Sequence, residues 1–424
     1  MRMRSIEMLI ALALVAAACG GTGDSVAGTG NDTTAAPSES SSPDEPTATS
    51  GSDASTATVA DQGEGAEVDL PSLIAPLENV WPTNWAKSTI DLGELRVGIG
   101  SSDPRDIIRP IDAPVYEGIT SANEWLEDQE VGIALEIGDD AIFYPIRILT
   151  AHEIVNDSRG DIPFSITYCP LCNTAVAFDR RVDGEVLRFG VSGLLRNSDL
   201  VMWDDKTTSL WQQTTGEAIV GEFAGTQLSF LPSALVRWAD FKDGFPNGDV
   251  LSRESGPFIY GQNSYVGYTS RSGPYAQFFP GELDDRFEAL SRVVGVRVDG
   301  ENKAYPFGVI ADEMAVNDEV NGTKLVVFWG APDAADPLDA FTTAGGAAIG
   351  TGIAFDRTVD GQVLTFSGNG DSTYTDAETG STWTILGVAT DGPLAGSELD
   401  TIIHQNEFWF AWAAFNPDSP VYGE

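Results

Sequence analysis

Short runs of alternating apolar and polar residues dominate the chain from about residue 68 onwards. β-Branched and aromatic residues fill these runs, and clusters of Gly, Pro, Asn and Asp separate them, as is typical of strands joined by turns. Apolar residues at helical spacing are scarce, and we expect only short helices, near 121–128 and 152–157. The pattern predicts a mainly β fold in which the helical part is minor.

Two parts of the chain repeat each other in the same order. The sequence VGIALEIGDDAIFYPIRILTAHEIVND at 131–157 is echoed by VGVRVDGENKAYPFGVIADEMAVND at 294–318. Further on, AFDRRVDGEVLRF at 177–189 is echoed by AFDRTVDGQVLTF at 354–366. Several matches in one order indicate a duplicated unit.

The duplication predicts two β-rich units that resemble each other, each a sandwich or barrel-like structure. Asp-Gly turns join two strands at Asp183-Gly184 and again at Asp360-Gly361. We expect the first unit over 68–255 and a second, degenerate unit over 291–424, with the Gly- and Tyr-rich residues 256–290 as the connection.

The first 67 residues have the pattern of an export signal and a tether. Arg2 and Arg4 precede an apolar run that ends in Ala-Ala-Ala-Cys, similar to a bacterial lipoprotein box, so we expect a signal over 1–19 and lipidation at Cys19. Residues 20–67 are rich in Ser, Thr, Gly and Asp and have no aromatic residue, which predicts a flexible tether. The expected location is the outer face of the cell membrane, or secretion if Cys19 is not lipidated.

The charge of the chain excludes some partners. With 64 acidic and 23 basic residues, the net charge is −41 and the pI is near 4.1. Nucleic-acid backbones and anionic membrane surfaces would be repelled, so we expect no nucleic-acid partner and a membrane contact only through the lipid anchor. The sequence names no small-molecule or protein partner.

Two of the three cysteines, Cys169 and Cys172, lie in TYCPLCNTAVAFDR at 167–180, between strand-like segments. A C-P-x-C turn aims two thiolates at one point, and Asn173 after it tolerates positive φ. In a thioredoxin-type motif a helix follows the cysteines and lowers the pKa of the first thiol. Because a strand follows here, the segment favours a metal site over dithiol chemistry.

Comparing the two units suggests a third ligand. Glu313 stands in the second unit where the first has His152, and the cysteines have no counterpart there, so these three residues belong to a site and not to the shared scaffold. Thiolates and imidazoles suit zinc, copper or iron. We therefore predict one transition metal ion held by Cys169, Cys172 and His152. We expect His152 to begin the short helix at 152–157, which returns to the cysteine strand.

Three protein ligands would leave one coordination position open. His404, the other histidine of the chain, is a possible additional ligand if the two units meet face to face. Glu153 or Asp199 is a candidate acid/base group beside a metal-bound water.

Two other functions stay open. The first is a thiol–disulfide oxidoreductase with Cys169 as nucleophile and Cys172 as resolving thiol. The second is a surface binding or scaffolding module with an inert cysteine pair. The chain contains no G-x-S-x-G, H-E-x-x-H, P-loop or C-x-x-C-H motif, so whether it is an enzyme stays undecided.

With HEIVND, TYCPLCNTAVAFDR, FGVSGLLRNSDLVMWDD, SLWQQTTGEAI and FWFAWAAFNPDS in view, the chain resembles a family of exported prokaryotic proteins catalogued as domain of unknown function 3179. The resemblance extends from about Asp103 to the C-terminus. In that family Gly commonly follows the second cysteine, where this chain has Asn173. The resemblance implies a repeated architecture and a signature at Cys169 and Cys172, and it supplies no substrate.

Overall fold

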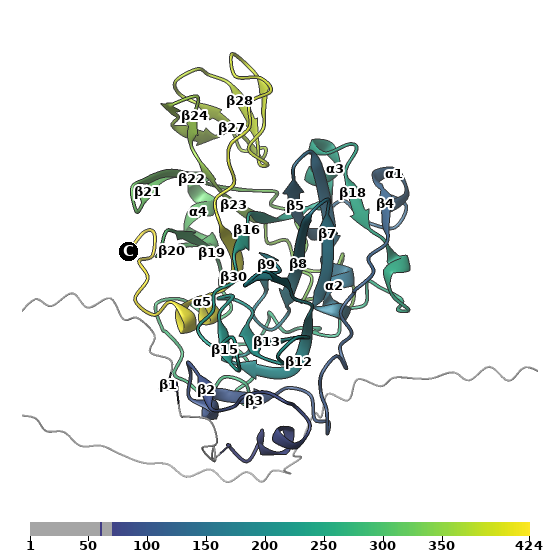
Figure 1. Cartoon of the computed structure of the whole chain (residues 1–424). Helices are drawn as coiled ribbons and strands as arrows, with labels where there is room; N and C mark the ends of the chain where they lie inside the picture. Colours follow the sequence, from purple (N-terminus) through teal and green to yellow (C-terminus); the bar gives the residue numbers. More distant parts are fainter. Residues whose placement is uncertain (1–59, 62–69) are drawn as a thin grey trace, which may run out of the picture. The chain divides into compact units, whose positions relative to one another are not determined.

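The computed structural model describes residues 60–61 and 70–424, which lie within one compact unit of the chain. This part is mainly β, as predicted (Figure 1). The predicted signal, Cys19 and nearly all of the predicted tether lie outside the described residues. No helix in the described part is both long enough and apolar enough to cross a membrane. The α-helices are α1 (Ile119–Ala122), α2 (Ile146–His152), α3 (Trp238–Gly244), α4 (Phe307–Glu313) and α5 (Trp409–Phe415).

The strands fall into an N-terminal group and two halves. The N-terminal strands are β1 (Ala60–Asp61), β2 (Lys87–Ser88), β3 (Leu95–Val97) and β4 (Tyr116–Gly118). Those of the first half are β5 (Val131–Ile137), β6 (Asp140–Pro145), β7 (Ile154–Arg159), β8 (Ile162–Cys169), β9 (Thr174–Asp179), β10 (Arg181–Val182), β11 (Glu185–Val186), β12 (Phe189–Arg196), β13 (Asp199–Asp204), β14 (Leu210–Gln212), β15 (Ala218–Val220), β16 (Phe230–Leu231), β17 (Ser233–Arg237) and β18 (Asp249–Leu251).

Between Gly256 and Ser291 the chain forms no helix or strand. The second half then repeats the first: β5-β6-α2-β7-β8-β9 recurs as β19-β20-α4-β21-β22-β23, and β17-α3 recurs as β30-α5. Its strands are β19 (Arg292–Val298), β20 (Glu301–Pro306), β21 (Ala315–Val320), β22 (Thr323–Gly330), β23 (Thr351–Asp356), β24 (Thr358–Val359), β25 (Gln362–Val363), β26 (Phe366–Gly368), β27 (Thr373–Asp376), β28 (Thr382–Thr384), β29 (Ala389–Asp391) and β30 (His404–Phe408).

The sheets of the two halves correspond as well. In the first half the strand orders are β16-β9-β8-β7 and β17-β5-β6-β18-β4; in the second they are β23-β22-β21 and β30-β19-β20. In the seven-stranded sheet β1-β2-β15-β14-β13-β12-β3, the four strands of the first half, β12 to β15, have their counterpart in β26-β27-β28-β29. The halves meet where β30 packs against β9 and β17. Strands β30 and β9 lie side by side in Figure 1.

The residues that recur in both halves build the scaffold. Asn156 exchanges two hydrogen bonds with the backbone of Phe189, of 2.8 and 3.0 Å, and Asn317 does the same with Phe366 at 2.8 Å for both. The Asp-Gly turns also recur, with φ of 50° at Asp183 and 49° at Asp360. Recurring residues therefore maintain the fold, which separates them from residues found in one half only.

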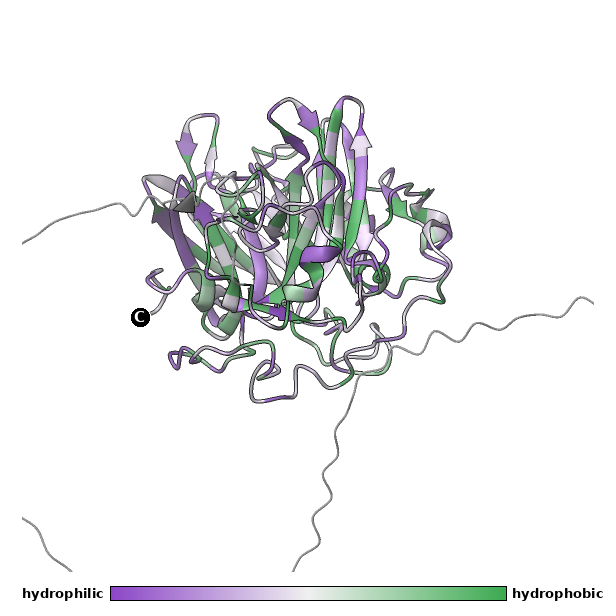
Figure 2. Ribbon diagram, turned by 60° about the horizontal axis from the view of Figure 1, so that its bottom comes forward, coloured by the Kyte–Doolittle hydropathy of each residue, from purple (hydrophilic) through white to green (hydrophobic). Residues whose placement is uncertain are grey.

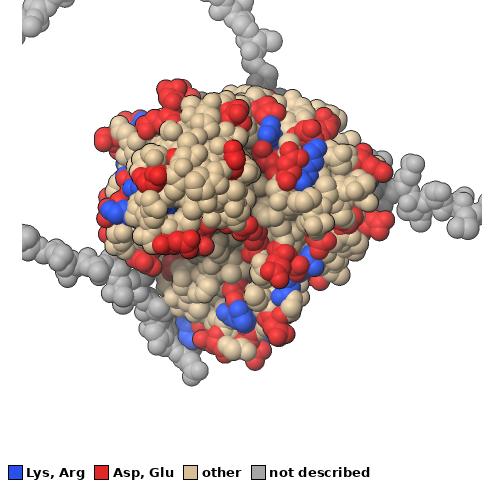
Figure 3. Space-filling view, turned by 90° about the horizontal axis from the view of Figure 1, so that it is seen from above, with Lys and Arg blue, Asp and Glu red and all other residues tan. Residues whose placement is uncertain are grey.

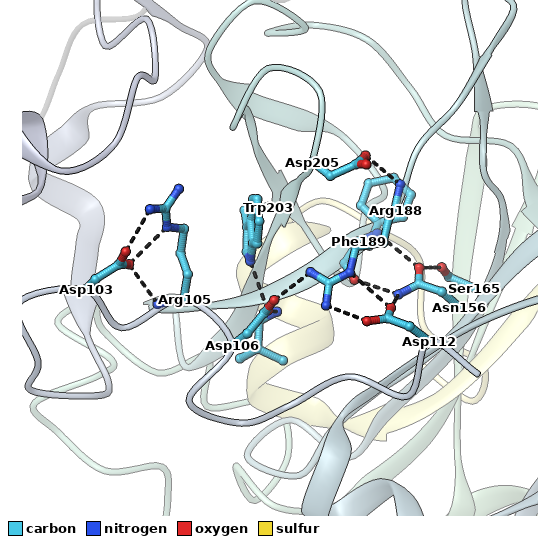
Figure 4. A network of polar contacts seen from close by, with 11 residues as sticks. Asp103, Arg105, Asp106, Asp112, Asn156, Ser165, Arg188, Phe189, Trp203 and Asp205 are labelled. Atoms are coloured by element: carbon cyan, nitrogen blue, oxygen red, sulfur yellow. Dashed lines mark hydrogen bonds and ion pairs between the residues drawn. The ribbon is translucent and has the colours of Figure 1, made fainter. Parts of the chain in front are cut away.

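Around Asn156 the first half adds an ionic network (Figure 4). Arg188 pairs with Asp106 at 2.6 Å and with Asp112 at 2.9 Å, and Asn156 donates to Asp112 at 2.8 Å. The network ties the loop before β4 to β12, the strand that leads into the turn at Ser198. Hydrophobic residues lie along the strands (Figure 2), and acidic side chains dominate the charged positions on the face shown in Figure 3.

Two predicted helices are wrong in their position. Residues 154–159 form strand β7, and His152 ends helix α2 instead of beginning a helix. The β-branched residues of the segment pair with β8, and this pairing overrides the expected helix. Near 121–128 the helix is a single turn, α1, that ends at Ala122.

Candidate metal centre

The two cysteines lie at the tip of the β8–β9 hairpin. Cys169 ends β8 and pairs with Thr174, the first residue of β9. Between them the chain turns, with Cys172 N–H donating to the Cys169 carbonyl at 3.3 Å and Asn173 at φ 55°. The strand-turn-strand context and the positive φ at Asn173 agree with the sequence prediction.

A carboxylate from another hairpin completes a group with these thiols. The Sγ atoms of Cys169 and Cys172 and a carboxylate oxygen of Asp199 all lie within 4.8 Å of one another. All three side chains are buried, and both thiols are free. This arrangement brings together three atoms that can each bind a metal ion.

Asp199 reaches the cysteines because a two-residue turn precedes it. Asn197 and Ser198 join β12 to β13 with φ of 50° and 64°. The Ser198 carbonyl lies 3.7 Å from Cys169 Sγ, so the turn itself contacts the cysteines. Asp199, the first residue of β13, then directs its side chain to the thiols.

One oxygen of Asp199 is free for a ligand. Oδ2 accepts hydrogen bonds from Gln212 Nε2 at 2.6 Å and from the Thr214 N–H at 3.0 Å. Oδ1 is buried and has no hydrogen-bond partner among the described residues. Burial raises the pKa of Asp199 to about 6 in spite of these hydrogen bonds, which lower it. A buried oxygen without a partner is costly unless a cation or a proton occupies it.

Burial also raises the pKa of both thiols. For Cys169 the hydrogen bond from Cys172 opposes the rise, while the neighbouring Asp199 adds to it. The pKa of Cys172 is raised further, by burial first. Without a cation both groups are neutral thiols at pH 7, and a bound metal ion would reverse this by stabilising the thiolates.

Glu153 is a second buried carboxylate beside the group. Its backbone carbonyl accepts a hydrogen bond of 2.8 Å from the N–H of Tyr168, the residue before Cys169. No described residue donates a hydrogen bond to its carboxylate, and burial, followed by the charge of Asp199, raises its pKa to about 8. Met314 has the same backbone conformation in the second half, with φ 60° against 59° for Glu153.

The second half contributes a third carboxylate, Glu407 of β30. It accepts hydrogen bonds from Gln405 at 2.5 Å, from Thr174 at 3.3 Å and from Thr214 at 3.4 Å. Burial raises its pKa to about 7, against the lowering effects of Gln405 and Arg297. Sequence reasoning did not find Glu407; the signal was the polar run HQNE directly before the apolar FWFAWAAF.

The structure does not bring the two histidines into the group of thiols and carboxylate. His152 Nδ1 lies 2.6 Å from the Arg109 carbonyl, and Nε2 lies 2.7 Å from the Tyr260 hydroxyl. His404 Nδ1 lies 2.7 Å from the Ile402 carbonyl, while its Nε2 has no partner among the described residues. Of the residues considered from the sequence, the structure brings Cys169, Cys172 and Asp199 together, with Glu153 adjacent.

The chain is matched over residues 105–419 by the model of a family described as Protein of unknown function (DUF3179), and it belongs to that family. This confirms the resemblance found in the sequence motifs. Neither the curated proteins nor the solved structures contained a match to the chain. The matched range includes the cysteine turn, Asp199, Glu153 and Glu407.

Proposed function

We propose that this member of the DUF3179 family binds one transition metal ion through Cys169, Cys172 and Asp199. The observation that supports it best is the group of two free thiols and a carboxylate oxygen within 4.8 Å. In this proposal Asp199 replaces His152 as third ligand, because both ring nitrogens of His152 already have partners. Two thiolates and one carboxylate suit zinc or iron, or copper in its reduced state.

The charge balance of the interior supports a cation at this position. Asp199, Glu153 and Glu407 are buried acids in one region, together with the two thiols. The positive side chain that acts on Glu407 is Arg297, which is itself half-buried. Buried charges need a partner of opposite sign, and a divalent ion at the thiols supplies one.

Three protein ligands leave a coordination position open, as in catalytic metal sites. A metal bound there would supply Lewis acidity to whatever molecule occupies that position. Glu153, whose carboxylate accepts no hydrogen bond from a described residue, is placed to hold or accept a proton beside the site. The site as a whole therefore suits a catalytic or sensing role better than a closed structural one.

The test is elemental analysis of the purified full chain, with free thiols titrated on the same samples. We expect about one metal ion per chain, lost in the double variant Cys169→Ser/Cys172→Ser. Asp199→Asn should bind the metal at least about tenfold more weakly, because even loss of a residue that only orients a ligand costs about 10- to 100-fold in affinity. His152→Gln is the matched control and should retain the metal.

The two alternative functions give different results in the same experiment. A thiol–disulfide oxidoreductase would contain no metal and a pair of thiols that oxidises and reduces reversibly. A scaffolding module would contain no metal, and its inert pair of cysteines would not oxidise and reduce reversibly. Either result would overturn the metal site.

A further inference from the structure

A pocket of about 380 Å³ lies where three distant parts of the chain meet. The turn before β13 contributes Asn197, the connecting segment contributes Phe279 and residues 281–284, and the region of α5 contributes Phe410, Ala413, Ala414 and Pro417. Because both halves and the connection supply its walls, the pocket exists only in the assembled fold.

The inner wall of the pocket is aromatic. Phe279 and Phe410 pack edge to face with ring centroids 5.4 Å apart, and both belong to the apolar cluster that contains Cys169 and Cys172. Small side chains on α5, Ala413 and Ala414, leave the space in front of them open. Such a wall suits an apolar or aromatic group of a ligand.

The charged residues around the pocket indicate which polar group a ligand would carry in addition to its apolar group. Glu282 and Asp284 line the pocket, and its lining includes no Lys or Arg. Arg286 pairs with Asp284 at 2.9 Å, whereas Glu282 is exposed and has no ion-pair partner among the described residues. The surplus carboxylate favours an ammonium group and disfavours carboxylates and phosphates.

The pocket and the cysteine site share one turn of the chain. Asn197 lines the pocket, and the next residue, Ser198, donates its N–H to the Phe278 carbonyl at 2.8 Å and lies 3.7 Å from Cys169 Sγ through its own carbonyl. The Ser198 hydroxyl is buried and has no partner among the described residues. A ligand that moves this turn would also move Asp199.

We propose that this pocket binds a small primary amine with an aromatic body, and that its occupation changes the geometry at Cys169 and Asp199. The proposed amine binding depends only on the pocket and not on the proposed metal site. The change at the cysteines rests on the proposed metal site.

Calorimetric titration of the full chain with 2-phenylethylamine, 2-phenylethanol and phenylacetate tests the amine site. We expect the amine to bind at least about tenfold more tightly than phenylacetate, a difference of about 1.4 kcal/mol. Ala414→Trp fills the pocket and should weaken amine binding at least about tenfold. Asp243→Trp, at the equivalent position of α3, is the matched control and should bind as the wild type does.

Three results would overturn the amine site: no binding of the amine, equal binding of phenylacetate, or unchanged binding in Ala414→Trp. Should Ala414→Trp fail to fold, as judged by its circular dichroism, Glu282→Gln replaces it. This exposed change should reduce the preference for the amine over the alcohol, and an unchanged preference would contradict the proposal.

The link to the cysteines is tested with Co²⁺, whose bands from thiolate coordination report the geometry of the site. We expect the amine to shift these bands in the wild type and not in Ala414→Trp. If Co²⁺ binds and the amine binds without a shift, the link is wrong. If Co²⁺ does not bind at all, the proposed metal site fails, while the calorimetric result still decides the amine site.

Discussion

The backbone N–H of Phe408 donates a hydrogen bond of 2.9 Å to the carbonyl of Cys172. This bond joins the last strand of the second half to the cysteine turn of the first. The preceding residue, Glu407, accepts a hydrogen bond from Thr174, the first residue after that turn. The second half contains no cysteine, but residues of its strand β30 hydrogen-bond to the cysteine turn of the first half and to the strand that follows it.

Replacing Glu407 by Gln should change how stability depends on pH in the metal-free protein. Burial raises the pKa of Glu407 from 4.5 to about 7. Between these two pH values the carboxyl group is protonated in the folded state and ionised in the unfolded state. Its contribution to stability is full below pH 4.5 and is lost as pH rises to about 7 and above. With about 1.4 kcal/mol per pKa unit, the loss is about 3 kcal/mol.

Urea unfolding of the wild type and Glu407→Gln at pH 4.5 and pH 8 measures this difference. Relative to the wild type, the free energy of unfolding of Glu407→Gln should increase by a few kcal/mol between pH 4.5 and pH 8. A gap that does not depend on pH would show that Glu407 titrates normally and that the interior around the site is not short of positive charge.

His404 should give a pH dependence over a different range. Its Nδ1 lies 2.7 Å from the Ile402 carbonyl and therefore carries the proton, while burial lowers the pKa of the ring from 6.5 to about 4. The unfolded state binds a proton below pH 6.5, whereas the folded state binds it only near pH 4. The free energy of unfolding therefore decreases as the pH is lowered from 6.5 to 4. The loss is about 3 kcal/mol by the same conversion.

His404→Gln removes this titration and keeps a side-chain donor. The stability of the wild type should fall relative to the variant between pH 6.5 and pH 4, as measured by urea unfolding at several pH values. Parallel profiles for the two proteins would mean that the ring is protonated at its ordinary pKa, which its burial without a second partner makes difficult.

The paired asparagines of the scaffold should differ in their importance. Asn156 has four hydrogen bonds, two of them to Phe189, one to Asp112 and one from Ser165, whereas Asn317 has the two to Phe366. Since each net hydrogen bond contributes about 1 kcal/mol, Asn156→Ala should cost about 4 kcal/mol and Asn317→Ala about 2 kcal/mol.

Thermal or urea unfolding of both asparagine variants checks this order. Metal content is the second measurement, and it should equal that of the wild type in any variant that folds, because Asn156 does not touch the thiols. Loss of metal from a folded Asn156→Ala protein would place this residue in the site and contradict its scaffold role.

Local patterns in the sequence were sufficient for the hairpin around the cysteines. The β-branched flanks and Asn173 define that turn within a few residues, so its conformation follows from local chemistry. His152 is different, since its ring contacts Arg109 and Tyr260, residues 43 and 108 positions away. No local sequence pattern predicts such distant neighbours. His152 was a candidate ligand mainly because histidine is scarce in the chain, and the structure shows that both of its ring nitrogens already have partners.

The positions of the carboxylates in the site also depend on contacts that local sequence patterns do not predict. Asp199 reaches the thiols by way of a turn with two positive φ values, and Glu407 comes from the second half of a duplicated chain. The comparison of the two halves found what is missing from the second half. It could not find Glu407, which the second half adds, because β30 and β9 are far apart in the sequence and are brought together only by tertiary packing.

Glu153→Met should stabilise the metal-free protein. Met314 adopts the same backbone conformation at the same position of the second half, so Met fits this positive φ without new strain. The change removes a buried carboxyl group that no described residue hydrogen-bonds, and relief of such a group is worth about 1 to 2 kcal/mol. Residues held at a cost to stability are often retained for function, which agrees with a proton-accepting role for Glu153.

The measurement is the free energy of unfolding at pH 7, with Met314→Glu as the reciprocal control. That control should lose about 1 kcal/mol, because Met314 packs against Gly368 at a half-buried position and not beside other acids. Metal content of Glu153→Met should equal that of the wild type if Glu153 accepts protons and is not a ligand. Destabilisation by Glu153→Met would show that the carboxyl group has a structural partner, and it would remove Glu153 from the proposed site.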